Sequence, residues 1–158
     1  MSTRAYVGLG ANLGGDLRQT LLSAVGALDA LPQTRLAAVS SAWRSAPVDA
    51  GGPDFLNAVA ALDTDLEPLA LLDALQGIEL AHGRERPYRN APRTLDLDLL
   101  AYGDVTLDTP RLTLPHPRVA ERAFVLRPLW ELAPGMWAQP ADGAWASQRI
   151  ECCGPLLG

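Results

Sequence analysis

The segment at residues 93–100 holds the side chains of this chain best suited by type and spacing to chemistry. Apolar and acidic residues alternate strictly over residues 95–99, a pattern typical of a β-strand with one buried face. With the leucines in the core, Asp96 and Asp98 project from the opposite face, their Cα atoms roughly 6.6 Å apart. Two carboxylates at this spacing can share one Mg²⁺ ion or hold a pair of ions through hard oxygen ligands.

The segment before this strand is rich in arginine: Arg84, Arg86, Arg89 and Arg93 fall within ten positions. Guanidinium groups bind phosphate oxygens through paired donors, so carboxylates beside an arginine cluster form a clamp suited to a metal-bound polyphosphate. The pattern alone leaves a second interpretation open, in which an ordinary soluble loop precedes a strand with a solvated acidic face.

The composition is that of an ordinary globular protein with an excess of acidic residues. The 158 residues, 48% hydrophobic and 20% charged, predict one domain over residues 1–158 with a core of its own. The net charge of −5 argues against general binding to nucleic acid or anionic membranes. All 13 basic residues are arginine, which excludes a P-loop lysine and a Schiff-base lysine.

The two cysteines, Cys152 and Cys153, are adjacent and near the C-terminus. Neighbouring cysteines make a poor structural disulfide, and two ligands do not complete a zinc site. We therefore expect them in a loosely held tail rather than in a redox site. The sequence shows neither a charged-then-apolar leader nor an apolar run near the ~18 residues of a membrane span, and we expect a cytoplasmic monomer.

Hydrophobic periodicity predicts a mixed α+β domain. We expect helices at residues 16–31 and 67–82, and strands at residues 4–10, 36–44, 55–62, 95–99 and 124–129. A short edge strand at residues 105–107, an extended segment at 111–117 and a short helix at 119–122 complete the prediction. The β-α-β-β-α-β order favours a ferredoxin-like fold, a three-layer α/β/α sandwich whose mostly antiparallel sheet has helices packed on it.

Five blocks of sequence, in order, resemble a known family. They lie at residues 6–14, 53–57, 91–98, 114–117 and 122–126. Together they cover roughly residues 4–135 and resemble the 6-hydroxymethyl-7,8-dihydropterin pyrophosphokinases, with residues 138–158 outside the resemblance. The chain departs from the family at Asn90, near a common tryptophan, and at Phe55 and Pro117, where a tyrosine and an aromatic residue are usual. The loop at residues 84–93 is about one residue shorter.

The resemblance implies an ATP-dependent diphosphokinase of folate biosynthesis. Such an enzyme transfers the terminal pyrophosphoryl group of ATP to the hydroxymethyl oxygen of a reduced pterin and releases AMP. By position, Asp96 and Asp98 would hold two Mg²⁺ ions. Arg84 and Arg93 would be the catalytic residues that stabilise the transferring group.

The resemblance also implies two sets of binding residues. Those that contact the pterin would be Ser45, Ala46, Val48, Phe55, Asn57 and Phe124, with the two phenylalanines on either face of the ring and the asparagine at its amide edge. Those that line the nucleotide site would be Gln76, Glu79, Arg84, Arg93, Leu99, Arg111, Thr113, His116 and Arg122.

Residue types alone predict ordinary roles for several of these positions. Phe55 and Phe124 would belong to a core, His116 to a packed loop and Glu79 to a solvated helix face. Two other functions also stay open at this point. One is a ferredoxin-like module that binds Mg-nucleotide without turnover, and the other is a Mg-dependent phosphotransferase with a different acceptor alcohol.

Overall fold

The structure is a computed structural model that describes residues 2–11, 16–45, 54–82, 95–117, 119, 123–134 and 150–156. A six-stranded antiparallel sheet with the order β5-β1-β4-β3-β8 forms its centre, and β2 also pairs with β4. Its strands are β1 (Thr3–Ala11), β2 (Thr34–Val39), β3 (Ser41–Ser45), β4 (Phe55–Thr64), β5 (Asp96–Tyr102) and β8 (Ile150–Pro155). The other elements are α1 (Leu17–Asp29), α2 (Pro68–Ala81), α3 (Ala123–Leu132) and a small hairpin of β6 (Leu107–Asp108) and β7 (Thr113–Leu114).

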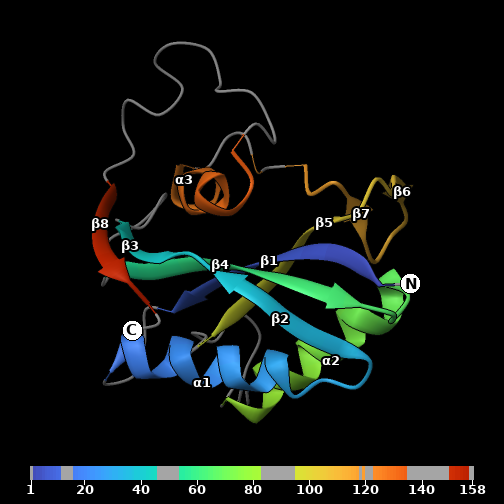
Figure 1. The fold of residues 1–158 in the computed structure, drawn as a ribbon, viewed down its shortest axis with the longest axis horizontal. Coiled ribbons are helices and arrows are strands. Elements are labelled where there is room, and N and C mark those ends of the chain that lie inside the picture. The colour runs from blue at the N-terminus through green and yellow to red at the C-terminus, as the bar shows by residue number, and fades with distance from the viewer. Residues whose placement is uncertain are drawn as a thin grey trace.

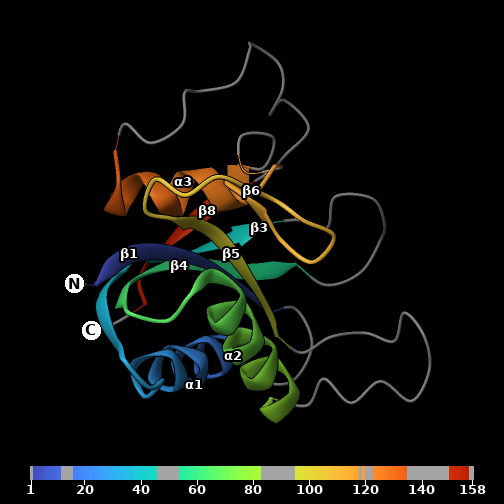
Figure 2. The same cartoon turned by 90° about the vertical axis from the view of Figure 1, so that its right-hand side faces the viewer.

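The elements stack in three layers. Helices α1 and α2 cover one face of the sheet, and α3 lies on the opposite face (Figures 1 and 2). This confirms the predicted fold class, a mixed α+β sandwich with a mostly antiparallel sheet. No helix among the described ranges has both the length and the apolar character needed to cross a membrane.

Both faces of the central strands are buried. On β1, Ala5, Val7 and Leu9 are at most 3% exposed and belong to the core cluster that α1 and α2 complete. Tyr6 points the other way and packs with Val59 in the cluster that α3 completes. A strand segment covered on both faces is apolar on both, which explains the apolar run at residues 58–62 of β4.

Helices α1 and α2 confirm the predicted periodicity. The side chain of Asp16 caps α1 by accepting a hydrogen bond from the backbone N–H of Gln19 at 3.1 Å, and such a cap satisfies an otherwise unpaired helix donor. Pro68 occupies the first turn of α2, where its missing N–H costs no helical hydrogen bond. In both helices the buried residues recur at spacings of three and four, so each presents one apolar stripe to the sheet.

Three predicted elements differ from the structure. The predicted strand at residues 124–129 is wrong, because these residues form part of α3. Leu126 and Leu129, both fully buried, lie three residues apart on the face of α3 that meets the sheet. The predicted single strand at residues 36–44 is divided at Ser40, whose hydroxyl accepts from the backbone N–H of Val59 at 2.9 Å. The short edge strand predicted at residues 105–107 is instead the hairpin of β6 and β7, and the helix predicted at 119–122 lies almost entirely outside the described residues.

The predicted loose tail around the cysteines is also wrong. Cys152 and Cys153 lie in β8, which pairs with β3 along the edge of the sheet. Both thiols are free and exposed. The end of β8 is fixed to α1, because Nη2 of Arg18 donates to the carbonyls of Pro155 and Leu156 at 2.8 and 2.9 Å. The C-terminal strand is therefore an integral part of the sheet.

The carboxylate of Asp63 forms ion pairs with two arginines where β1, β4 and β2 lie side by side. Asp63 accepts from Nε of Arg4 at 2.7 Å and pairs with Nη2 of Arg35 at 3.3 Å. The hydrogen bond from Arg4, followed by the one from Arg35, lowers the pKa of the Asp63 carboxyl. The carboxylate side chain is only 15% exposed, but the arginines are 48% and 79% exposed, so solvent weakens the pairing.

We predict that Asp63→Asn lowers the free energy of unfolding at pH 7 by no more than about 1 kcal/mol. Because the folded-state pKa is depressed, this contribution is present above the unfolded-state pKa and disappears as pH falls through the folded-state value. Urea denaturation should therefore show a difference between variant and wild type at pH 7 that vanishes well below about pH 4. A difference that persists unchanged at low pH would contradict this assignment.

Candidate active site

Two glycines of β1, Gly8 and Gly10, form a glycine floor between β4 and β5 on the α3 side of the sheet, with the side chain of Leu100 packed over Gly8. Gly8 pairs with Asp98 of β5, and Gly10 pairs with Asp96 of β5 on one side and Asn57 of β4 on the other. Directly paired residues of neighbouring strands point to the same face. Asp96, Asp98 and Asn57 therefore share one face, with the asparagine roughly 10 Å across the strands from Asp96.

The predicted alternation of the aspartate strand is confirmed. Leu95, Leu97 and Leu99 are at most 5% exposed in the core, while Asp96 is half-buried and Asp98 is exposed on the opposite face. Both carboxylates therefore face away from α1 and α2 and can offer oxygen ligands above the sheet. Among the described His, Cys, Asp and Glu side chains, no group of three comes together as a ready-made metal cage.

The glycine floor brings the backbone of β1 close to any bound molecule. A Cβ atom at Gly10 would lie 3.4 Å from Oδ1 of Asn57 and 4.0 Å from Cδ1 of Phe55. These contacts show that Asn57 and Phe55 lean over the same part of the floor. A larger side chain at Gly10 would fill the space between them and the aspartates, so glycine keeps this surface accessible.

Asn57 is held in one orientation by its neighbours on β3. Its side chain is 5% exposed, and Nδ2 donates to the backbone carbonyl of Trp43 at 3.0 Å and to Oγ of Ser45 at 2.8 Å. An amide nitrogen has two hydrogens, and both are used. The carbonyl oxygen Oδ1 then lies on the Gly10 side, where it can accept a hydrogen bond from a ligand.

Glu79 of α2 is buried beneath the aspartate strand, contrary to the solvated helix position that its residue type suggested. It is 4% exposed, and Oε2 accepts from the backbone N–H of Leu97 at 2.9 Å. Leu97 lies between Asp96 and Asp98, so this hydrogen bond fixes the backbone that carries both carboxylates. The expected contact of Glu79 with the nucleotide stays a prediction.

Arg111 and Gln76, which sequence analysis placed in the nucleotide site, lie together at the exposed surface of α2. Nη2 of Arg111 pairs with Oδ1 of Asp73 at 2.5 Å and approaches Oε1 of Gln76 at 3.4 Å. Arg111 comes from the turn between β6 and β7, whereas Asp73 and Gln76 lie one helical turn apart. The structure thus brings Gln76 and Arg111 together, and it adds Asp73, which sequence analysis had not singled out.

The segment at residues 113–116 docks against the outer edge of β5. The backbone N–H of His116 donates to the carbonyl of Leu100 at 2.9 Å, and the Leu114–Pro115 peptide is cis. Thr113, in β7, is half-buried. His116 and Thr113 are therefore held beside the strand that carries the aspartates, while the side chain of Leu99 lies in the core and leaves only its backbone to meet a ligand.

Other predicted residues divide into two groups. Ser45 is buried and supports Asn57, Phe55 is half-buried on the same face, and Phe124 is half-buried in the first turn of α3. The remaining predicted residues, Ala46, Val48, Arg84, Arg93 and Arg122, lie outside the described residues. Trp43 was missed, although strand alternation from Ser45 would have placed it on the same face.

The described residues form a three-layer sandwich that places paired carboxylates and a buried amide on one face of its sheet. The family model described as 7,8-dihydro-6-hydroxymethylpterin-pyrophosphokinase (HPPK) matches residues 6–134. The chain belongs to this family.

Named relatives agree with the assignment. A 2-amino-4-hydroxy-6-hydroxymethyldihydropteridine pyrophosphokinase of Pseudomonas aeruginosa is 49% identical over 154 residues, covering 97% of this chain and 93% of the relative. The enzyme of the same name from Haemophilus influenzae is 45% identical over 130 residues, covering 82% and 81%.

A crystal structure of HPPK-DHPS in complex with substrates superposes with a TM-score of 0.69 at 12% identity and covers 92% of this chain. Wild-type Plasmodium falciparum HPPK-DHPS gives a TM-score of 0.66 at 13% identity and covers 93%. This chain spans only 43% and 41% of those two chains, and at such identity they show a shared fold.

We predict that Glu79→Ala lowers the free energy of unfolding by about 1–3 kcal/mol, because the buried N–H of Leu97 loses its acceptor. Glu79→Gln, which keeps a carbonyl oxygen, should cost less. Gln76→Ala, on the exposed side of the same helix, is the matched control and should change stability by at most about 0.5 kcal/mol. Urea denaturation measures all three, and equal losses for Glu79→Ala and Gln76→Ala would show that the buried hydrogen bond is unimportant.

Proposed function

We propose that this chain transfers pyrophosphate from ATP to the hydroxymethyl group of 6-hydroxymethyl-7,8-dihydropterin in a Mg²⁺-dependent reaction of folate biosynthesis, giving AMP and the pterin diphosphate. One observation carries the proposal. Paired carboxylates and a buried amide acceptor lie on the same sheet face, on either side of a glycine floor. This arrangement suits a metal-bound triphosphate beside a flat heterocycle with hydrogen-bond donors.

The donor set of the aspartate strand fits Mg²⁺. This ion prefers oxygen ligands and is usually held by one or two carboxylates together with substrate phosphates, which Asp96 and Asp98 can supply on one face. When bound, Mg²⁺ would neutralise the triphosphate and make its β-phosphorus more electrophilic. The protein would hold the two carboxylates at a fixed spacing. The hydrogen bond from the backbone N–H of Leu97 to Glu79 helps to fix that spacing, because it holds the backbone between them.

The pterin side of the proposal uses the orientation of Asn57. Because both amide hydrogens of Asn57 are engaged by Trp43 and Ser45, only Oδ1 can meet the ligand, and it must accept. The amino and ring N–H groups of a pterin are donors, so they match this oxygen. Phe55 and Phe124 would stack on the ring and hold it in the plane that this hydrogen bond selects.

The nucleotide side of the proposal relies on arginine. Arg111 would release its exposed ion-pair partner Asp73 and bind the nucleotide instead. Gln76, which lies beside Arg111, would contact the nucleotide as well. Arg84 and Arg93 would meet the charge that develops between the α- and β-phosphates in the transition state, and Glu79, Leu99, Thr113, His116 and Arg122 would line the rest of the site. Catalysis of this kind depends on positioning and charge stabilisation rather than on a covalent intermediate.

We predict that Asp96→Asn and Asp98→Asn each lower turnover by roughly a hundredfold or more, because a shared metal ligand is lost. Thermal melting checks that each variant is still folded. The matched control is Asp104→Asn, an exposed aspartate just beyond β5, which should leave turnover unchanged. Steady-state kinetics across a Mg²⁺ titration tests the three variants, and full activity in either site variant would refute the carboxylate pair.

We predict that the product of ATP is AMP rather than ADP. A γ-phosphoryl kinase usually cradles the β- and γ-phosphates with a lysine, and this chain contains none. Chromatography of a single-turnover mixture with the pterin and Mg²⁺ should show AMP and a diphosphorylated pterin in equal amounts. ADP with a monophosphorylated pterin would refute the proposed reaction, and nucleotide binding without either product would indicate a module without turnover.

A further inference from the structure

A carboxylate on α3 joins that helix to the middle of β3. Oε2 of Glu131 accepts from the indole Nε1 of Trp43 at 2.6 Å. Its other oxygen, Oε1, accepts from the hydroxyl and the backbone N–H of Ser41 at 2.8 and 3.1 Å. One side chain thus takes three hydrogen bonds from β3, and bonds to a charged acceptor are stronger than those between neutral groups.

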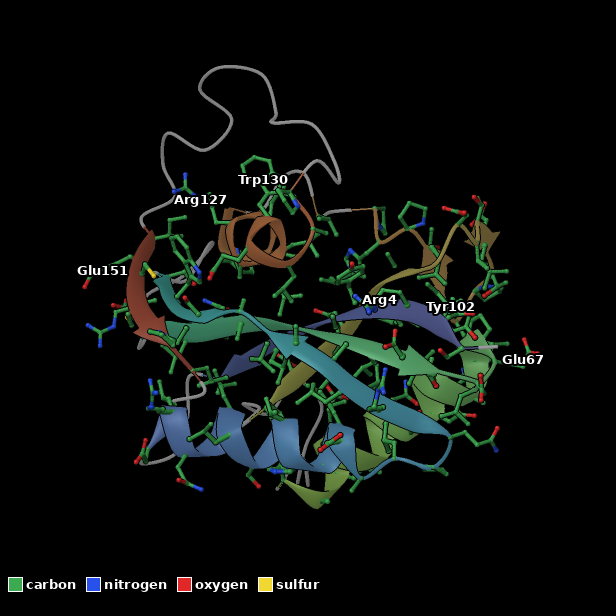
Figure 3. The ribbon with its side chains drawn as sticks, viewed as in Figure 1. Arg4, Glu67, Tyr102, Arg127, Trp130 and Glu151 are labelled. Carbon is green, nitrogen blue, oxygen red and sulfur yellow. The ribbon has the colours of Figure 1, made fainter. Side chains whose placement is uncertain are left out.

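A second contact between α3 and β3 involves the same tryptophan. The guanidinium carbon of Arg127 lies 5.4 Å from the centre of the Trp43 ring, a distance at which the cation is attracted to the ring face. In Figure 3, Arg127 lies on the side of α3 toward β8, whereas Trp130 points away from the sheet. Trp43 is therefore held at its edge by Glu131 and at its face by Arg127.

The backbone of Trp43 belongs to the proposed pterin site. Its carbonyl accepts one of the two hydrogen bonds that orient Asn57, and the two residues are directly paired across β3 and β4. A shift of Trp43 would therefore alter the direction in which Oδ1 of Asn57 points. The backbone of Trp43 therefore contacts the floor of the site, and its side chain contacts α3.

The helix that Trp43 holds also carries Phe124. Phe124, Arg127 and Glu131 are spaced by three and four residues, so they lie along one side of α3. Pro128 lies inside this helix, and because proline has no N–H it cannot donate to the carbonyl of Phe124.

We propose that Trp43 and Glu131 are positioning residues for the pterin, an inference that rests on the proposed function. They set the distance and angle between the wall of the site on α3, which bears Phe124, and its floor on β4, which bears Phe55 and Asn57. Within the described residues, the hydrogen bonds and ring contact of Trp43 and Glu131 join β3, β4 and α3 and do not involve the aspartate strand or the group around Arg111. Their loss therefore weakens pterin binding and leaves nucleotide binding intact.

The experiment compares Glu131→Ala, Glu131→Gln and Trp43→Phe with wild type. Calorimetry with a non-hydrolysable ATP analogue and Mg²⁺ gives the Kd of the nucleotide and then that of the pterin. We expect Glu131→Ala and Trp43→Phe to raise the pterin Kd about tenfold or more, because charge-assisted hydrogen bonds are lost. Glu131→Gln, which keeps one acceptor oxygen, should have a smaller effect, and the nucleotide Kd should change less than about twofold.

The matched control is Asp63→Asn, which removes ion pairs at the opposite end of the same sheet and should leave the pterin Kd unchanged. A nitrogen-15 spectrum of the tryptophan indoles checks the Trp43 contact directly, since its signal should shift in Glu131→Ala. Variants that fold and bind pterin as wild type does would overturn the inference, as would equal losses for pterin and nucleotide. Failure of wild type itself to bind pterin would instead refute the proposed function.

Discussion

The rest of the structure depends on the burial of β1 and β4 on both faces. Their apolar side chains must be covered from two sides, which requires α1 and α2 below the sheet and α3 above it. Beyond Tyr6, β1 has glycine at positions 8 and 10 and offers no side chain to the upper face. Polar groups from β4 and β5 gather there, so the site lies where the continuous apolar core ends.

Buried polar side chains determine where the groups of the site point. Asn57 is oriented by β3, and Glu79 accepts from the backbone of the strand that carries Asp96 and Asp98. A buried amide or carboxylate without partners would destabilise the fold. Because each of these groups is satisfied in one geometry, the same hydrogen bonds that stabilise the core also fix the site.

Each half of the site is attached to a different layer. The aspartate strand is supported from below by α2, through Glu79, and the proposed pterin half is supported from above by α3, through Glu131. The two supports share no residue. Effects on the proposed metal and nucleotide half can therefore be separated experimentally from effects on the proposed pterin half, as expected for sites with independent partners.

The sequence by itself determined the α+β class, the two amphipathic helices, the alternation that places Asp96 and Asp98 on one face, and the family. These follow from local periodicity and from contiguous motifs. Tertiary structure alone decided that residues 124–129 are helical, since a short apolar run suits a buried strand or a buried helix equally well. It also decided that Cys152 lies opposite Trp43 in the sheet and that Glu131 reaches Trp43. Such partners are about a hundred residues apart in the chain, and only the packing of the layers brings them together, because local sequence does not encode strand pairing or side-chain contact over that distance.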